Sequence, residues 1–163
     1  MKRATYIFVF LAVVILTSVI IFTLYKYPNR KYESRDLSQF FENGKFGYIN
    51  KKGKIVIKPR FDDTLGFSEE LAGVKIGDKW GYIDKEGKIV IMPRFDDVED
   101  FSEGLAGVKT GDKWGYIDKK GKIVIMPRFE DAEDFSEGLA GVKIGNKWSY
   151  IDKEGKMVKV IDP

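Results

Sequence analysis

The sequence predicts an all-β fold: tandem three-stranded antiparallel β-meanders with a period of 34 residues, stacked as an open array and preceded by one transmembrane α-helix. An aromatic residue that follows a lysine sets the period, because it recurs at Phe46, Trp80, Trp114 and Trp148. The runs between glycines are short and rich in β-branched and aromatic residues, which is typical of strands. The helix is predicted from the uncharged run of residues 4–25.

Residues 1–25 are predicted to form a signal-anchor helix that contacts the membrane through residues 4–25. A helix of about 22 residues, each rising about 1.5 Å, reaches about 33 Å and so spans a hydrocarbon core of about 30 Å. Tyr6 and Tyr25 lie near its ends, where interfacial aromatic residues are common. A cleaved signal peptide is the alternative, but its apolar core is usually about 7–15 residues and ends in small residues. This run is longer and ends in F-T-L-Y.

A basic spacer, residues 26–36, follows the apolar run. Lys2 and Arg3 lie on one side of the run and the lysines and arginines of the spacer on the other, so the positive-inside count does not fix the orientation. By analogy with ordinary signal anchors, we place the amino terminus in the cytoplasm. The expectation is a single-pass membrane protein with an extracytoplasmic repeat domain.

Residues 37–163 form the repeat domain, with units at about 37–70, 71–104, 105–138 and 139–163. Tetratricopeptide repeats share the period of about 34 residues, so a helical interpretation has to be considered first. A helix hairpin needs two runs of about a dozen residues with few glycines. Within one period this chain has glycines at 73, 77, 81 and 87 and a proline at 93, which excludes such a hairpin.

The third unit illustrates the strands and turns that the sequence predicts. Gly111-Asp112 suits a type II′ hairpin, and the Asp and Gly of D-K-K-G, residues 118–121, suit a type I turn with a bulge. Pro127 cannot donate to a ladder and is expected to stop the last strand. A longer connection, 127–138, follows, with room for a single helical turn. The predicted strands are residues 105–110, 113–118 and 122–126.

Side-chain alternation places Trp114 and Tyr116 on one face of the second strand and leaves a gap at Gly115, where a neighbouring group could approach closely. The unbroken apolar run of residues 123–126 indicates a strand covered on both faces. One small meander cannot bury both faces, so neighbouring units must stack. Terminal units then lack one neighbour, which fits the replacement of Gly by Ser149 in the last unit.

Composition and charge exclude several classes of function. The 163 residues include no Cys and no His, which excludes disulfides, thiolate zinc sites and catalysis by Cys–His or Ser–His–Asp groups. Residues 1–44 account for the whole formal net charge of +3, so residues 45–163 are neutral. A phosphate-binding surface needs a basic excess on the folded part, and nucleic acid is therefore not an expected partner.

Residues 37–161 resemble the WG repeat, also called the KWG repeat. The motif F-S-E-G-L-A-G-V-K-x-G-x-K-W-G-Y-I-D-K-x-G-K-I-V-I-x-P-R-F carries this resemblance and is matched several times. The resemblance implies a β-rich repeat of bacterial proteins, often surface or envelope proteins. It also implies a presumed binding role and no established catalytic residues.

Three polar patterns are interpreted as structural, so no catalytic residue, metal or cofactor is expected. The acidic cluster of residues 96–103 lacks the alternating ligands and Gly bend of a calcium loop and is interpreted as solvated and partly paired with Arg94 and nearby lysines. Carboxylate pairs that could serve glycoside hydrolysis are copied in successive units, not confined to one cleft. The serines of F-S-E (Ser68, Ser102 and Ser136) have no His and are expected to bond the loop backbone.

Aromatic side chains are the one feature of the repeats with binding potential. Exposed, they form a stacking platform for sugars or a quaternary amine; buried, they are core, which is the commoner case. Two hypotheses follow: a membrane-tethered module for protein–protein interaction with an unknown protein, and binding of envelope glycan through the aromatic ladder. The candidate ligand-binding residues are Trp80, Tyr82, Trp114, Tyr116, Trp148 and Tyr150.

Overall fold

The computed structural model describes residues 37–161, which belong to one compact unit, Asp36–Pro163. These residues form fifteen β-strands and no helix, so the all-β prediction is confirmed for them. The predicted anchor helix, residues 1–25, and the spacer, residues 26–36, lie outside the described residues. Within residues 37–161, the structure contains no helix with the length and apolar character needed to span a membrane.

Four antiparallel sheets follow one another in chain order, and we name them A to D. Sheet A contains β1 (Ser38–Glu42), β2 (Lys45–Ile49) and β3 (Ile55–Phe61). Sheet B contains β4 (Asp63–Ser68), β5 (Leu71–Ile76), β6 (Lys79–Ile83) and β7 (Ile89–Phe95). Sheet C contains β8 (Asp97–Val98), β9 (Leu105–Thr110), β10 (Lys113–Asp118) and β11 (Ile123–Phe129). Sheet D contains β12 (Asp131–Ala132), β13 (Ala140–Ile144), β14 (Lys147–Ile151) and β15 (Met157–Ile161).

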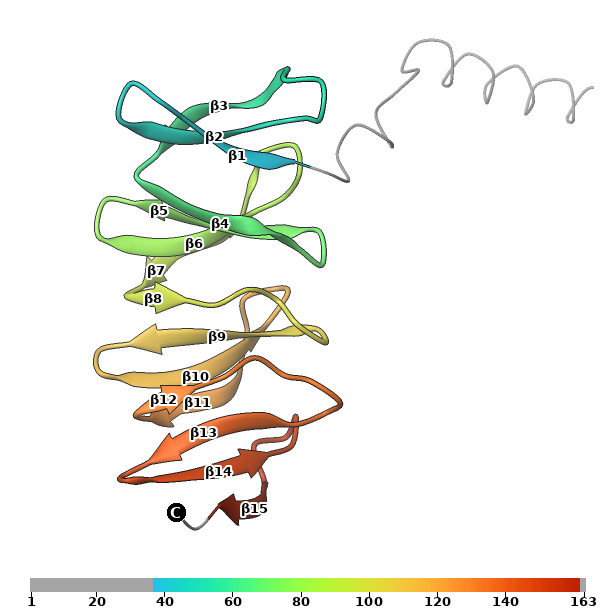
Figure 1. The fold of residues 1–163 in the computed structure, drawn as a ribbon. Coiled ribbons are helices and arrows are strands. Elements are labelled where there is room, and N and C mark those ends of the chain that lie inside the picture. The colour runs from blue at the N-terminus through green and yellow to red at the C-terminus, as the bar shows by residue number, and fades with distance from the viewer. Residues whose placement is uncertain (1–36, 162–163) are drawn as a thin grey trace, which may run out of the picture. The chain divides into compact units, whose positions relative to one another are not determined.

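Within each sheet the strands are neighbours in chain order, so every sheet is a β-meander (Figure 1). The sheets form successive layers of the repeat domain, with β1–β3 at one end and β13–β15 at the other. The core lies between the layers. One cluster joins Trp80 and Tyr82 of sheet B to Val98, Phe101 and Val108 of the sheet C unit. Each layer thus obtains apolar cover from the next.

The predicted hairpin turns are confirmed by the backbone. Asn43 and Gly44 both have positive φ, 52° and 77°, as a type I′ turn requires. At the hairpin between β5 and β6 only Gly77 has a positive φ, of 62°, which fits a type II′ turn. Gly87 has φ of 81° and donates its N–H to the carbonyl of Asp84 at 2.9 Å, closing the turn between β6 and β7.

The predicted connection of residues 127–138 is wrong in detail, because it contains strand and no helical turn. β11 continues through Pro127 to Phe129, and after one residue the chain enters β12, which pairs with β13 of the next sheet. We call residues 96–104 and 130–138 the connectors. The N–H of Glu133 donates to the carbonyl of Gly141 at 2.8 Å. This backbone bonds the neighbouring sheet, which a single unit considered alone cannot indicate.

β11 continues past Pro127, because the hydrogen-bond ladder is irregular at that point. Trp114 pairs with Phe129 and Tyr116 with Ile125, so β11 has extra residues opposite Gly115. A bulge leaves residues without a ladder partner, and a proline is tolerated among them. The predicted close approach at Gly115 is confirmed, since a Cβ there would lie 2.5 Å from the carbonyl oxygen of Ile125.

The expectation that residues 123–126 are covered on both faces is wrong. Ile125 is 4% exposed, whereas Val124 is 42% and Met126 68% exposed. β11 is the outermost strand in the order of sheet C, so only the inward side chain reaches the core between the layers. The apolar run therefore reflects one buried position and an exposed apolar surface.

Candidate functional site

In sheets A to C, the strand that contains the repeat tyrosine (β2, β6 or β10) is fastened to the following layer. In sheets A to C its tyrosine is fully buried, and its hydroxyl donates to a backbone carbonyl of the next unit. Burial raises the pKa of each of these phenols above its usual value. The hydrogen bonds join Tyr48 to Leu65 at 2.8 Å, Tyr82 to Glu99 at 2.6 Å and Tyr116 to Glu133 at 2.7 Å.

A ring contact accompanies the hydrogen bonds of Tyr82 and Tyr116. The ring of Tyr82 meets Phe101 edge-on with centroids 4.8 Å apart, and Tyr116 meets Phe135 in the same way at 4.9 Å. Edge-to-face pairs add about 0.5–1.5 kcal/mol beyond the apolar area they bury. The aromatic residues of the connectors are therefore part of the packing between layers.

The hydroxyls of Ser68 and Ser102 bond backbone, as predicted, but the backbone belongs to the next layer; no such bond forms from the hydroxyl of Ser136 within the described residues. Ser68 Oγ donates to the carbonyl of Phe101 and Ser102 Oγ to that of Phe135, both at 2.7 Å. The neighbouring glutamates act at the same place. Glu69 accepts from the N–H of Gly104 and Glu103 from that of Gly138, each at 3.0 Å.

A second carboxylate in each connector joins hairpins of adjacent layers. Asp96 pairs with Lys79 of sheet B and accepts the N–H of Gly111 of sheet C at 2.7 Å. The Lys79 hydrogen bond and then the Gly111 N–H lower the pKa of Asp96. Glu130 repeats this arrangement with Lys113 at 3.0 Å, and its pKa is lowered in the same way.

Other connector carboxylates are half-buried and repel one another. Burial raises the pKa of Asp100, and burial together with the charge of Asp100 raises that of Asp134. Arg94 was expected to pair with the acidic cluster of residues 96–103. It instead donates to the carbonyl of Gly121 at 2.6 Å. Residues 37–161 contain no group of three or more acidic side chains placed to hold a metal ion.

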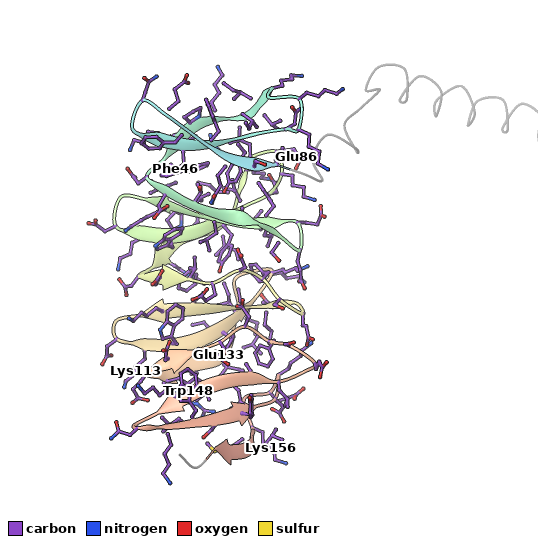
Figure 2. The ribbon with its side chains drawn as sticks, viewed as in Figure 1. Phe46, Glu86, Lys113, Glu133, Trp148 and Lys156 are labelled. Carbon is purple, nitrogen blue, oxygen red and sulfur yellow. The ribbon has the colours of Figure 1, made fainter. Side chains whose placement is uncertain are left out.

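The six predicted aromatic site residues fall into two sets. Trp80, Tyr82, Trp114 and Tyr116 are buried between layers, with the two indoles 7% and 6% exposed. Trp148 and Tyr150 of sheet D are only half-buried. Together with Glu133, Gly141 and Ser149 they line a pocket of about 200 Å³. Figure 2 shows Trp148 and Glu133 in the last two layers, at the opposite end from Phe46.

Sheet D also carries the counterparts of the groups that fasten each inner layer to the next. Tyr150 corresponds to Tyr116, Ser136 to Ser102 and Glu137 to Glu103, each 34 residues on. None of these three side chains makes a hydrogen bond or ion pair with another of the residues that the structure describes. Tyr150 was predicted as a ligand-binding residue, whereas Ser136 was predicted only to bond the loop backbone and Glu137 was not predicted. The repeat offset in the printed sequence could have identified both.

A further surface consists of exposed apolar side chains on the outermost strands β3, β7 and β11. Each of these strands also begins after a lysine and contains an arginine, with no acidic residue between them. The most exposed members are Met92 and Met126, both 68% exposed. We call this surface the edge stripe and define it as Val56, Val90, Met92, Val124 and Met126.

Comparison with protein families finds one match. Residues 46–80, 80–114 and 114–148 each match the family described as the WG containing repeat. A comparison with curated proteins finds no match.

Solved structures give only weak likenesses. A 2S albumin seed protein from Dolichos is 18% identical, with 79% of this chain and 90% of that chain covered and a TM-score of 0.33. The hemopexin fold protein CP4 from cow pea is 15% identical, with 80% and 88% covered and a TM-score of 0.34. A plant lectin from cicer arietinum with two metal binding sites is 14% identical, with the same coverage and TM-score. These TM-scores are too low to inform fold or function.

Proposed function

Because the chain belongs to the family of WG containing repeats, we propose that it is a non-catalytic binding module that mediates protein–protein interaction at the cell envelope. In this proposal residues 4–25 anchor the chain in the membrane as a single span, and the repeats lie outside the cytoplasm. The uncharged run of residues 4–25 supports the anchor. The neutral charge of the repeats and their extended, repeated surface support the binding role.

The edge stripe is the observation that carries the proposal. Exposed methionine is adaptable and is frequent at binding surfaces, and Met92 and Met126 occupy the same place in adjacent layers. Basic side chains flank the apolar ones: Lys88 and Arg94 in β7 and its approach, Lys122 and Arg128 around β11. The partner that fits is a protein segment that presents apolar side chains and carboxylates at the spacing of the layers.

Photo-crosslinking of the full-length protein tests this partner. Photo-methionine incorporated at Met92 and Met126 should link partner peptides that contain apolar and acidic residues. In co-purification without crosslinking, the double variant Met92→Lys/Met126→Lys should lose this partner, whereas Ile76→Lys/Ile144→Lys, which changes two apolar residues that are both 41% exposed on hairpins outside the stripe, should keep it. Equal retention by both variants, or crosslinks to lipid alone, would overturn the proposal.

The membrane part of the proposal has its own test. After alkaline carbonate extraction the full-length chain should remain in the membrane fraction, and a variant without residues 4–25 should be released. Protease added to intact spheroplasts should digest the repeats. Release of the full-length chain by carbonate would contradict the anchor, and protection of the repeats would contradict the orientation.

Binding of envelope glycan is a second candidate, which the half-buried Trp148 and Tyr150 favour. Aromatic faces beside a carboxylate such as Glu133 suit a sugar ring. The buried indoles of the inner layers are closed to such a ligand, so the candidate is confined to sheet D. Peptidoglycan fragments should then shift the tryptophan emission of the wild type but not that of Trp148→Phe.

A further inference from the structure

Two layer interfaces, between sheets B and C and between sheets C and D, bind the same connector segment with the same three kinds of side chain. From sheet B, the hydroxyl of Tyr82, the hydroxyl of Ser68 and the carboxylate of Glu69 bind the connector that begins sheet C. From sheet C, the corresponding residues bind the connector that begins sheet D. Both connectors read E-D-F-S-E-G in this part, at residues 99–104 and 133–138.

The three contacts read different atoms of that segment, as the interface between sheets C and D shows. The tyrosine donates to the carbonyl of the first Glu, and the serine donates to the carbonyl of the Phe. The glutamate accepts the N–H of the Gly. The Phe ring packs edge-on against the tyrosine ring. The Phe ring is the one side chain of the segment in these contacts, and its other partners are backbone groups, so a segment of the connector pattern E-x-F-x-x-G satisfies the whole set.

Sheet D presents the same set, and no other segment of residues 37–161 is bound to it. Ser136 and Leu139 exchange backbone hydrogen bonds of 2.8 and 3.1 Å, as Ser102 and Leu105 do. Glu137 has φ of 53°, and Glu103 has φ of 51°. The backbone that positions the serine and the glutamate is thus the same in both layers. Tyr150 is half-buried beside the pocket of about 200 Å³, so its ring is accessible.

The face of sheet D is altered where a whole further layer would dock. In the inner layers Arg94 bonds the turn carbonyl of Gly121, and Ile91 packs against the same glycine. At the corresponding places after β14 the sequence has Asp162 and Lys159. By sequence, sheet D therefore keeps the side chains that hold a connector, but not the isoleucine and the arginine that hold the rest of a layer.

We propose that sheet D binds an acidic E-x-F-x-x-G segment of another polypeptide through Tyr150, Ser136 and Glu137. The occupant is a connector-type peptide, bound by the interface that the chain already uses twice internally. Residues 31–36 precede sheet A and occupy the same repeat position as residues 99–104, but they read K-Y-E-S-R-D and lack the pattern. The segment before the first sheet of a second copy is therefore not the proposed occupant. This site is separate from the edge stripe.

A synthetic peptide with the sequence of residues 130–138 tests the proposal on the full-length protein in detergent. Titration should shift the emission of Trp148, the half-buried indole. Phe→Ala in the peptide should weaken binding at least about tenfold, because an edge-to-face aromatic pair and buried area are lost. A scrambled peptide of equal charge should bind no better than the Phe→Ala peptide.

Protein variants separate recognition from folding. Tyr150→Phe and Glu137→Gln should each weaken peptide binding by about fivefold to tenfold, the usual worth of one hydrogen bond. Tyr116→Phe, which removes the same hydroxyl inside the stack, should leave the affinity unchanged. Met92→Lys/Met126→Lys should also bind the peptide normally, so failure here and failure of the stripe proposal are distinguishable.

Three results would overturn the proposal. The first is that the wild type does not bind the peptide. The second is that Tyr150→Phe and Glu137→Gln bind it as tightly as the wild type does, and the third is that the scrambled peptide binds as tightly as the peptide of residues 130–138. A shift of Trp148 emission by peptidoglycan fragments but not by the peptide would overturn it in favour of a glycan site.

Discussion

Sheets C and D contain the same strand pair built in two ways. In sheet C, Trp114 pairs with Phe129 and Tyr116 with Ile125, so β11 bulges opposite Gly115. In sheet D, Trp148, Ser149 and Tyr150 pair with Ile161, Val160 and Lys159 in regular succession. The glycine of the repeat has become serine in the one sheet where the bulge beside it is absent.

The difference shows why the repeat needs its glycine. At Gly115 a Cβ would lie 2.5 Å from the carbonyl oxygen of Ile125 and 2.6 Å from the nitrogen of Pro127. In regular pairing no backbone is forced over that position, and Ser149 is accommodated while only 3% exposed. The glycine is therefore required by the bulge that passes over it, not by the strand in which it lies.

The largest expected effect comes from placing alanine at this repeat position in each of the two sheets in turn. Gly115→Ala should destabilise the protein by about 3 kcal/mol or more, because β11 must move off the new Cβ. Ser149→Ala should change stability by less than about 1 kcal/mol, since the Cβ is already present. Urea denaturation followed by near-ultraviolet circular dichroism compares the two. Equal losses would mean that the bulge does not cause the requirement.

A second substitution should convert sheet C toward the geometry of sheet D. Pro127→Ile restores a backbone N–H at the position that Ile161 occupies in β15, so regular pairing becomes available. In the Gly115→Ala background it should recover about 1 kcal/mol, whereas alone it should destabilise. A double-mutant cycle from denaturant midpoints measures the coupling. Simple additivity would contradict the proposed link between the proline and the glycine.

Much of each unit could be predicted from its own residues. The hairpins at Asn43-Gly44 and Gly77-Asp78 depend on local turn chemistry, and the gap at Gly115 follows from alternation along one strand. The fourth strand, β8 or β12, could not be found in this way, because its hydrogen bonds go to a neighbouring unit. Pro127 was wrongly expected to end its strand for a different reason, because the bulge appears only in the pairing of β11 with β10.

The candidate site shows the same limit. Tyr150 was selected for its chemistry, but its accessibility depends on the layer that follows, as the burial of Tyr116 shows. Ser136 and Glu137 carry no signal of their own. Their role emerges only because Ser102 and Glu103, one period earlier, bind the next connector. Residues such as Ser136 and Glu137 are therefore best interpreted by comparison with the residues 34 positions earlier in the sequence.

Removing the tyrosine hydroxyl should have unequal effects on stability in the two sheets. Tyr116→Phe should destabilise by about 1 kcal/mol, because the buried carbonyl of Glu133 loses its donor. Tyr150→Phe should leave the free energy of unfolding unchanged within about 0.5 kcal/mol, since its hydroxyl has no partner to lose. Thermal unfolding of both variants provides the measurement. A matching loss for Tyr150→Phe would show that its hydroxyl is already engaged.

The smallest expected effect concerns Asp100, whose Oδ1 is buried without a hydrogen-bond partner in the connector of sheet C. Burial raises its pKa above the usual 3.8, so its folded form binds protons more readily than its unfolded form. Its contribution to stability therefore falls as pH rises from 3.8 through the folded pKa. Asp100→Asn should lack this fall and gain no more than about 0.5 kcal/mol at pH 7, after allowance for solvent screening.

The same substitution should also change the pKa of Asp134, which lies in the connector of residues 130–138. The charge of Asp100 helps to raise the pKa of Asp134, so Asp100→Asn should lower that pKa toward its usual value. Carboxyl carbon chemical shifts followed by NMR across the acidic range measure the change. An unchanged Asp134 titration would mean that burial alone perturbs it. The carboxylates of the two layers would then titrate independently, although their backbones are fastened together.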